Sequence, residues 1–486
     1  MVYHLNNIKV KQDKFFSQIP TYKDIPQLEL AQMFTVSSIW YEHNGDKQVA
    51  TFDLTVRDMP GKRNFLICGG IEEIINNILN WRYDKDYINY LSSQKIISKK
   101  FSNYLKKFKF SGDLWAIPEG TVFFPGEPIV RITAPLVDTN LLSTFVTDCI
   151  CFPTLFLSKA VRVKFATRGK IFVVNGAMRA NGFENLLKIH RCAYILGATS
   201  PIPYIMKKMG VEKPLTVDIT LYHAFIKSFH NELDAYRAIL SHIDAKADLS
   251  AMIDTYDIKS GLNNFIKAEK EAEKTGKKIP YIVIDSGNIL KLSFWARKEL
   301  DRAGLNHIGI CALSNLDEYK IEKLENAKAP IDVYGAITET MTVSDCPKLD
   351  AVYKLTEIIM NGNVRYTAKL TPGKVSLPGK KQIFRIYNKN SIMQRDVIGF
   401  VDENLGEPIM KQYIKKGRQI IDLPTIGQIQ EHLNKELIKI PDKLKSITKQ
   451  ISYPRKISKK IRQVVRKIKK EYREETSDIT DLEFFQ

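Results

Sequence analysis

Two short acidic motifs are the clearest candidates for chemistry in this sequence. Asp254-Thr-Tyr-Asp257 and Asp285-Ser-Gly287 each follow a short apolar run that is typical of a buried strand. A carboxylate placed there could accept hydrogen bonds from sugar hydroxyls or, with magnesium, help to hold a diphosphate, because hard cations prefer oxygen ligands. Gly287 would allow the backbone to approach a ligand closely. Each motif alone is weak evidence, since Asp-Ser-Gly is also a common turn.

The apolar runs before these motifs belong to a series that predicts a parallel sheet. After residue 155, mostly continuous apolar runs alternate with helical segments, as strands buried on both faces require. The runs are Ile171–Val174, Ser250–Ile253, Tyr281–Ile284, His307–Ala312 and Ile331–Tyr334. The residues that end or follow them include Asn175, Asp254, Asp285, Ser314 and Gly335. Each could be an ordinary turn residue, but the carboxyl ends of parallel strands line one cleft, so we predict a shared cleft.

Length and composition indicate a globular protein of two or three domains. The chain has 486 residues, of which 44% are hydrophobic and 26% charged, and a disordered chain would lack this apolar content. Its six cysteines are scattered without a Cys-x-x-Cys pair, so neither a disulfide scaffold nor a zinc cluster is predicted. The first residues contain no signal-peptide core, and charged residues interrupt the most apolar stretch, 141–161. We therefore expect a cytoplasmic protein without a membrane segment.

The regions on either side of the predicted sheet differ from it in pattern. Residues 70–82 and 95–108 are typical of helices, and 121–124 and 129–133 are typical of strands separated by a Pro-Gly-Glu-Pro turn. From about Lys369 a β-rich segment containing proline and glycine follows, and a final helix comes after it.

Positive charge is concentrated near the C-terminal end. Residues 439–470 contain thirteen basic residues and one acidic residue, Asp442. Apolar residues recur there at helical spacing, which predicts either an amphipathic helix docked on the body or a solvated tail. The alternative is a contact with nucleic acid or another acidic surface, although Tyr453 and Tyr472 alone offer rings for base stacking. An acidic, aromatic stretch, Asp478–Phe485, follows the basic segment.

Ordered motifs from about Gln32 to Gln382 resemble those of one family. In chain order, they are Glu119–Pro128, Thr154–Arg162, Arg179–Gly182, Ala193–Ser200, Ser228–Tyr236, Asp254–Asp257, Asp285–Gly287, Leu316–Glu318, Val352–Leu355 and Lys374–Gln382. On these motifs the chain resembles the nicotinate phosphoribosyltransferase family, type II phosphoribosyltransferases that also include nicotinamide phosphoribosyltransferase. Because several motifs depart from the family pattern, as described below, the resemblance is to a divergent member of this family.

The resemblance implies an α/β fold in which an irregular (β/α) barrel packs against a smaller N-terminal α/β domain. The expected divisions are 1–153 for the N-terminal domain, 154–345 for the barrel, 346–438 for segments that return to the N-terminal domain, and 439–486 for the basic tail with its acidic end. It further implies a homodimer with active sites near the subunit interface. The implied reaction transfers phosphoribosyl from phosphoribosyl pyrophosphate to a pyridine base on the route to NAD, with Mg2+ and with ATP as co-substrate.

The resemblance also assigns candidate site residues. His223, Asp254 and Asp285 are the expected catalytic residues, and His223 matches the histidine that is phosphorylated in the ATP-coupled step. Expected substrate contacts are Asn175, Arg179, Thr220, Ser286, Gly287, Lys159, Arg162 and Lys369, and no dedicated metal ligands are assigned. A structural histidine remains an alternative for His223. Surface or packing roles likewise remain open for Lys159, Arg162, Lys369 and Lys374.

Departures from the family pattern fall where the base and the phosphates are expected. The two aromatic rings that stack on the pyridine are replaced by Ala31 and Asn175, and two arginines by Met178 and Val283. The Gly-Thr-x-Ala-His-Ser motif is reduced to its threonine and histidine in Ile219–Ala224. The glycine-rich phosphate turns become Leu313-Ser-Asn315 and Gly335-Ala-Ile-Thr338, in which Ile337 could obstruct a phosphate.

Two hypotheses follow from this pattern. The first is an enzyme that acts on nicotinate or a related base. The second is a family-derived scaffold that has lost catalysis and serves as a binding or structural protein, with nucleic acid as a partner for its basic tail. Loss of the aromatic rings alone would suggest a different base, whereas loss of the phosphate turns as well favours lost activity.

Overall fold

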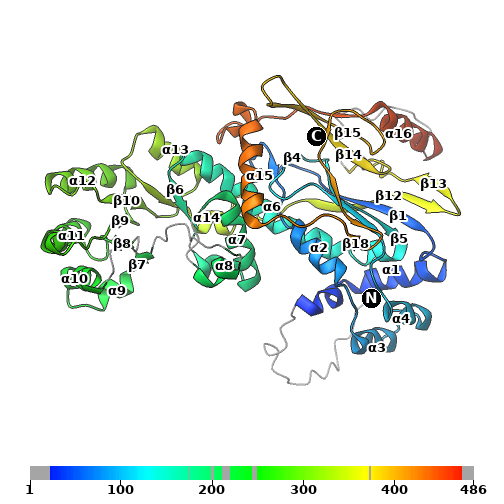
Figure 1. Cartoon of the computed structure of the whole chain (residues 1–486), viewed down its shortest axis with the longest axis horizontal. Helices are drawn as coiled ribbons and strands as arrows, with labels where there is room; N and C mark the ends of the chain where they lie inside the picture. Colours follow the sequence, from blue (N-terminus) through cyan, green and yellow to red (C-terminus); the bar gives the residue numbers. More distant parts are fainter. Residues whose placement is uncertain are drawn as a thin grey trace, which may run out of the picture.

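The computed structural model describes residues 22–174, 176–198, 202–208, 210, 219–242, 249–371 and 374–472. Two bodies follow one another along the longest axis of the molecule (Figure 1). One contains a parallel sheet with surrounding helices, and the other is built mainly from antiparallel strands. The described residues therefore form a mixed α/β fold.

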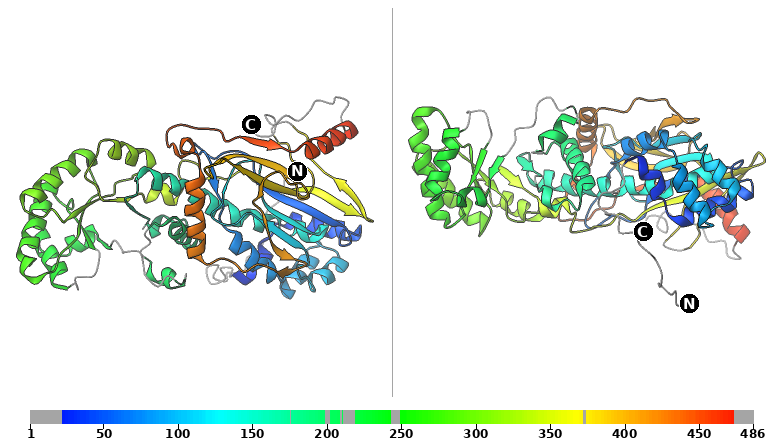
Figure 2. Two further views of the ribbon diagram at one scale, coloured as in Figure 1. Left: turned by 45° about the horizontal axis from the view of Figure 1, so that its top comes forward. Right: turned by 90° about the horizontal axis from the view of Figure 1, so that it is seen from below.

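The first body is a six-stranded parallel sheet with strand order β6-β11-β10-β9-β8-β7. Its strands are β6 Ile171–Val173, β7 Ile219–Leu221, β8 Leu249–Met252, β9 Tyr281–Ile284, β10 Gly309–Ala312 and β11 Val333–Gly335. Its α-helices are α7 Phe183–Leu196, α8 Pro203–Lys208, α9 His223–Lys227, α10 Glu232–His242, α11 Ile258–Ala272, α12 Ile289–Arg302, α13 Glu318–Asn326 and α14 Thr338–Met341. Two 3-10 turns, η3 Ala177–Arg179 and η4 Glu273–Thr275, complete it. The green helices form an arc outside the strands (Figure 2).

All five apolar runs noted in the sequence form strands of this sheet. Tyr281–Ile284 matches β9 in full, whereas β11 begins two residues later than the run at Ile331. The sixth strand, β7, was not among the predicted runs. Its three residues form one edge of the sheet and pair, among the described strands, with β8 alone. A strand of three residues is too short to show a clear period of two in the sequence.

The second body has a seven-stranded antiparallel sheet with order β13-β12-β1-β5-β3-β17-β18. These strands are β1 Val49–Val56, β3 Asp113–Ala116, β5 Pro128–Pro135, β12 Ala351–Met360, β13 Asn363–Tyr366, β17 Lys411–Lys415 and β18 Arg418–Gln419. Strands from the C-terminal part of the chain therefore flank strands from the N-terminal part on both sides. A smaller sheet contains β14 Lys381–Tyr387, β15 Met393–Phe400, β16 Glu407–Pro408 and β19 Arg455–Ile457, and β2 Leu66–Ile67 pairs with β4 Val122–Phe123.

The helices of this body lie before, between and after its strands. They are α1 Ala31–Glu42, α2 Ile71–Leu79, α3 Lys85–Ser93, α4 Lys99–Leu105, α5 Leu136–Asn140, α6 Ser143–Ala166, α15 Ile426–Lys439 and α16 Lys459–Tyr472. The short 3-10 segments η2 Tyr22–Leu28 and η5 Asp442–Lys445 belong here as well. The predicted helices at 70–82 and 95–108 correspond to the shorter α2 and α4.

Helix α6 connects the two bodies. It contacts α7, α13 and α14 of the first body and α2, β2 and β12 of the second. The expected division between 153 and 154 falls inside this helix, which contains Pro153. Within the described part of the chain, Leu136–Ala166 is the one stretch long and apolar enough to cross a membrane, but 67% of its most apolar window is buried inside the protein. That burial is typical of a core helix.

The segment expected to begin a separate tail is largely part of the second body. Ile440, Leu444, Ile447 and Tyr453 lie in the main hydrophobic core. The amide of Asn64 donates to the backbone oxygens of Leu444, Ser446 and Lys449 at 3.0–3.1 Å. Residues 439–458 are therefore not a detached basic segment, because their apolar side chains are needed to complete the core.

Candidate functional site

Three of the expected site residues meet at the carboxyl ends of β7, β8 and β9. His223 begins α9 two residues after β7, Asp254 lies two residues after β8, and Asp285 directly follows β9. All three side chains are half-buried. Because neighbouring parallel strands end at the same edge of a sheet, residues 31 positions apart along the chain are brought together. On this half of the sheet, three of the residues predicted to share a cleft therefore lie close together.

Asp254 is tied to the Asp285-Ser-Gly turn through one of its two carboxylate oxygens. The Ser286 hydroxyl donates to Asp254 Oδ2 at 2.7 Å, and the Asp285 backbone N–H donates to the same oxygen at 3.2 Å. The other oxygen, Oδ1, is buried and has no hydrogen-bond partner among the described residues. Gly287 completes the turn with φ +77°, a conformation that side chains disfavour. The turn thus orients this acid through Oδ2.

Asp285 is held by the next loop of the sheet. Its Oδ1 accepts a hydrogen bond of 2.7 Å from the Ser314 backbone N–H. Burial raises the pKa of Asp285, this hydrogen bond partly opposes that effect, and the negative charge of Asp254 raises the pKa further. Ser314 and Asn315 adopt φ values of +65° and +49°. Ser314, which stands where the family has glycine, therefore forms the tight turn despite its side chain.

His223 faces the same acids. Its Nδ1 lies 3.1 Å from the Thr255 hydroxyl, which directly follows Asp254. The charge of the imidazole lowers the pKa of Asp285 in part, against the larger effect of burial. No described residue forms a hydrogen bond with Nε2, so this nitrogen is the one left for another group. Thr255 was not predicted as a site residue, although it lies within the Asp-Thr-Tyr-Asp motif.

A third carboxylate, that of Glu232, lies close to Asp254. Glu232 is only 4% exposed, and its Oε1 has no hydrogen-bond partner among the described residues. Burial raises the pKa of Glu232, the Asn264 amide opposes this, and Asp257 and Asp254 raise it further. One helical turn later, the Tyr236 hydroxyl donates to the backbone oxygen of Met252 at 2.8 Å. Helix α10 therefore supports the end of β8, a role that the sequence pattern did not reveal.

The other half of the sheet edge is apolar. Leu313 follows β10 and packs on Gly335: a Cβ added there would lie 2.0 Å from Leu313 Cδ2. Ile337 packs on Gly176 in the same way, since a Cβ added to that glycine would lie 2.2 Å from Ile337 Cγ2. Leu313 belongs to a small buried cluster that spans the sheet, and Ile337 packs against it; the other members are Val173, Met252, Val283, Cys311 and Val333. Hydrocarbon side chains thus fill the two turns at which the sequence resemblance implied phosphate binding.

The remaining expected contacts are placed differently. Arg179 is exposed in η3, beside the exposed Met178. Asn175 lies outside the described residues, and of Thr220 only the backbone is described, paired with Ser250 in the sheet. Lys369 is exposed in the loop after β13, in the second body, where its backbone pairs with Ser376. Burial lowers the pKa of Lys354 most, and the nearby positive charges of Arg57, Lys369 and Lys374 lower it further. Four cations therefore gather there.

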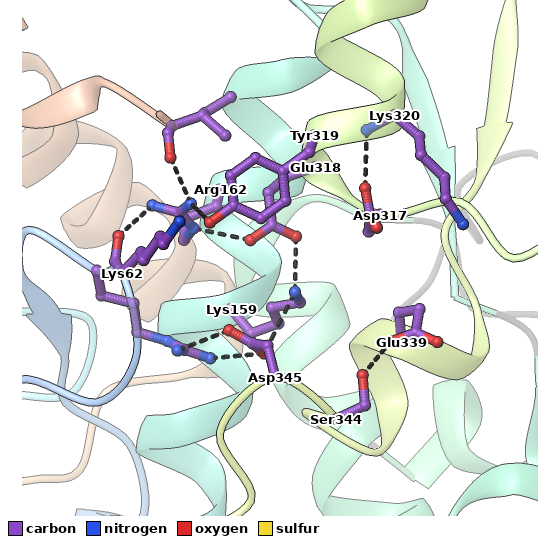
Figure 3. A network of polar contacts seen from close by, with 12 residues as sticks. Lys62, Lys159, Arg162, Asp317, Glu318, Tyr319, Lys320, Glu339, Ser344 and Asp345 are labelled. Carbon is purple, nitrogen blue, oxygen red and sulfur yellow. Dashed lines mark hydrogen bonds and ion pairs between the residues drawn. The ribbon is translucent and has the colours of Figure 1, made fainter. Parts of the chain in front are cut away.

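Lys159 and Arg162, expected at an anion site, belong instead to a buried ion-pair network on α6. Lys159 Nζ lies 2.6 Å from Glu318 Oε2 and 3.3 Å from Asp345 Oδ1. Arg162 Nε lies 2.9 Å from Glu318 Oε1, and its other nitrogens donate to the Tyr319 hydroxyl and two backbone oxygens. Figure 3 shows both cations directed at Glu318.

The network explains why these two cations are not open to a ligand. Lys159 is 2% exposed and Glu318 0% exposed. Burial favours the neutral acid, but Lys159 and Arg162 outweigh it and lower the pKa of Glu318. Two cations one helical turn apart on an apolar helix require acidic partners when they are buried. From that requirement, an acid such as Glu318 could have been expected from the sequence. The assignment of Lys159 and Arg162 to substrate binding is corrected accordingly.

Comparisons with known proteins agree with this architecture. Residues 31–151 match the family model of the nicotinate phosphoribosyltransferase N-terminal domain. The chain is 31% identical over 445 residues to nicotinate phosphoribosyltransferase pncB2 of Mycobacterium tuberculosis, covering 90% of this chain and 92% of that protein. It is 30% identical over 494 residues to the nicotinate phosphoribosyltransferase of Bacillus subtilis, covering 93% and 97%.

Solved structures show the same fold at lower sequence identity. The human nicotinic acid phosphoribosyltransferase superimposes with a TM-score of 0.75 at 19% identity, covering 91% of this chain and 99% of that one. A nicotinate-nucleotide pyrophosphorylase from Pyrococcus furiosus superimposes with a TM-score of 0.69, covering 88% and 99%. With relatives at 30% identity or more over nine-tenths of its length, this chain belongs to the nicotinate phosphoribosyltransferase family.

Proposed function

We propose that the chain transfers phosphoribosyl from phosphoribosyl pyrophosphate to nicotinate or a related base. The observation that carries the proposal is the convergence of His223, Asp254 and Asp285 at one edge of the parallel sheet. In such a transfer, positive charge develops on the ribose while the diphosphate leaves. Carboxylates fixed before the reaction stabilise that charge without having to reorganise.

Magnesium fits the oxygen ligands present. Asp254 Oδ1 is buried and lacks a hydrogen-bond partner among the described residues, as expected for an oxygen that serves a ligand. No group of three His, Cys, Asp or Glu side chains able to hold a metal occurs in the described residues. Mg2+ is commonly bound by one or two carboxylates together with substrate phosphates, so Asp254 and Asp285 would hold it with the diphosphate. Bound there, it would neutralise charge on the leaving group.

His223 is the proposed residue for coupling to ATP. The hydrogen bond between Nδ1 and the Thr255 hydroxyl fixes the ring and leaves Nε2 for a phosphoryl group. Asp285 lies close enough to interact with the charge of the imidazole. In this proposal, Thr255 orients the ring through Nδ1.

We further propose that the parallel sheet is an incomplete, irregular barrel and that the protein works as a homodimer. In one chain, the four cations around Lys354 and Lys369 lie in the body opposite the strand-end cleft (Figure 1). A second copy could supply such a cluster to the diphosphate, which a single cleft lacks because Lys159 and Arg162 are engaged by Glu318. A monomer by light scattering at micromolar concentration would remove this proposal.

The alternative is a scaffold without catalysis, and the packing of Ile337 and Leu313 favours it. These side chains occupy the turns where the family binds phosphate. One experiment separates the two functions: calorimetry with phosphoribosyl pyrophosphate and Mg2+, for the native chain and for Asp285→Ala. Binding that disappears in the variant supports the enzyme. Absence of binding by a folded native chain at millimolar ligand supports the scaffold for every base at once.

A further inference from the structure

A groove of about 680 Å³ lies at the end of the molecule opposite the cleft, between α16 and the β12–β13 hairpin (Figure 1). Its apolar lining consists of Ile359, Val364, Tyr366, Phe400, Val401 and Val464. Val364 is 52% exposed and Val401 42% exposed. In the register of the hairpin, Ile359 opposes Val364 and Glu357 opposes Tyr366, so one face of the hairpin forms this side of the groove.

Helix α16 forms the other wall and is firmly packed. Ile461 and Val465 are buried against Leu377, Ile398 and Phe400 in a cluster of their own. This packing turns Lys460, Gln463, Arg466 and Lys467 toward the groove. The basic helix is therefore docked, and part of its charge lines a cavity with an apolar surface.

The charges around the groove favour an acidic ligand. Four cations, Lys380, Lys460, Arg466 and Lys467, line it together with two acids, Glu357 and Asp402. Lys380 lies 3.3 Å from Glu357, and Lys460 lies 3.2 Å from Asp402. Lys467 is exposed and has no acidic side chain within ion-pair distance in the described part of the chain. A basic rim around apolar side chains fits an acidic peptide that carries large apolar residues.

The chain itself contains a peptide of this composition directly after α16. Residues 474–485 include five acids, Glu474, Glu475, Asp478, Asp481 and Glu483, and four large apolar residues, Ile479, Leu482, Phe484 and Phe485. From Tyr472 back to Lys460 a helix spans about 18 Å, at roughly 1.5 Å per residue. Twelve extended residues span up to about 40 Å, so this stretch is long enough to reach the groove.

We propose that residues 474–485 of the same chain occupy this groove. Their acids pair with Lys460 and Lys467, and their phenylalanines contact Val364 and Tyr366. Covalent attachment gives the segment an effective concentration of about a millimolar, so that weak contacts suffice. The occupied groove covers the basic face of α16 and opposes its binding to polyanions.

The test uses a fluorescent peptide with the sequence of residues 473–486 and measures anisotropy. A full-length chain is prepared with its own segment disabled by Asp478→Asn, Asp481→Asn, Glu483→Gln, Phe484→Ala and Phe485→Ala. We expect the peptide to bind this chain at least about tenfold more tightly than the native chain, because the native segment competes. Raising the salt should weaken the binding, since charge pairs contribute.

Matched charge reversals on α16 locate the binding site. In the disabled chain, Lys460→Glu with Lys467→Glu should weaken peptide binding by about tenfold or more. Lys459→Glu with Lys470→Glu makes the same charge change at exposed positions outside the groove lining and should have a much smaller effect. Circular dichroism verifies that both pairs of variants keep the fold.

Five outcomes would overturn the proposal. The first three are no peptide binding to the disabled chain at millimolar concentration, equal binding to the native chain, and equal effects of the two charge reversals. The fourth is a single-stranded oligonucleotide that binds the native and disabled chains equally and depends on Lys460 and Lys467, which would make the groove a nucleic-acid surface. A native chain that self-associates only when its segment is intact would instead place the segment on a second copy and would also exclude the proposal.

Discussion

The two halves of one sheet edge carry opposite kinds of side chain, polar at one and apolar at the other. At the ends of β7, β8 and β9, polar groups hold one another: Asp254 accepts from Ser286, Asp285 from Ser314, and His223 contacts Thr255. At the ends of β10, β11 and β6, Leu313 and Ile337 fill the space above glycines. The strand scaffold is common to both halves.

The difference shows what each half contributes. Buried polar groups lower stability unless they are hydrogen-bonded. An oxygen such as Asp254 Oδ1, which has no hydrogen-bond partner in the described part of the chain, therefore indicates a requirement other than stability. Apolar packing at the other half stabilises the fold but leaves little room for backbone N–H groups to approach a phosphate. The first half therefore keeps polar groups that hydrogen-bond one another, and the second half is closed by apolar packing.

The largest expected effect comes from the network that anchors the sheet to α6. Glu318→Ala should lower the free energy of unfolding by about 3–5 kcal/mol, because Lys159 is left buried without its main counter-charge. Urea unfolding followed by tryptophan fluorescence measures this. Glu322→Ala on the same helix is the control, since this half-buried residue forms no ion pair in the described structure, and should change stability much less. Equal losses in both variants would show that the network adds nothing specific.

The next effect tests the polar half directly and depends on the proposed activity. Asp254→Asn preserves shape but removes a negative charge, and we expect kcat/KM for phosphoribosyl transfer to fall by about 10²–10³-fold. Asp234→Asn makes the same change at a partly exposed position of α10 and serves as the matched control. Unaltered activity in Asp254→Asn would remove this residue from the proposed mechanism.

The apolar half can be tested by a double-mutant cycle. Gly176→Ala should destabilise the chain by about 1–3 kcal/mol, because the added methyl group would overlap Ile337 Cγ2 and crowd Met341 Sδ. Since Gly176 has φ −98°, its backbone accepts alanine without strain. In an Ile337→Ala background the loss should largely disappear. An equal loss in both backgrounds would mean that Ile337 does not fill this position.

The smallest effect concerns pH and lies outside both halves. Burial raises the pKa of Asp138 to about 7, although a hydrogen bond from the Tyr104 hydroxyl lowers it in part. A folded-state pKa above the unfolded value means that the folded chain holds the proton more tightly, so stability is greatest at low pH and falls as pH rises toward 7.

Thermal unfolding between pH 5.5 and 8 measures this contribution. We expect Tm to fall by about 2–4 °C more in the native chain than in Asp138→Asn, which remains neutral and can still accept from Tyr104. Parallel curves for the two proteins would assign the pH dependence to other groups.

Much of the architecture could be predicted from local patterns. Apolar runs ending in polar residues identified five of the six parallel strands. A final helix was predicted from the spacing of Ile457, Ile461, Val464, Val465 and Ile468; α16 begins at Lys459, and Ile457 lies instead in the strand β19. The Asp-Thr-Tyr-Asp and Asp-Ser-Gly motifs correctly identified the acids that meet at the strand ends. These features depend on neighbouring residues, because strand and helix periodicities repeat over a few positions.

The tertiary structure alone decided which polar groups meet. Lys159 and Arg162 have the composition of an anion site, but their partner Glu318 is more than 150 positions away and occupies them. Ser314 forms a turn that family comparison associates with glycine, and its backbone rather than its side chain holds Asp285. The basic segment after residue 439 contributes apolar side chains to the same hydrophobic core that contains Phe34. The type of a side chain determines which kinds of partner it can bind. Which partner it contacts depends on packing between distant parts of the chain, and a local sequence pattern does not contain that information.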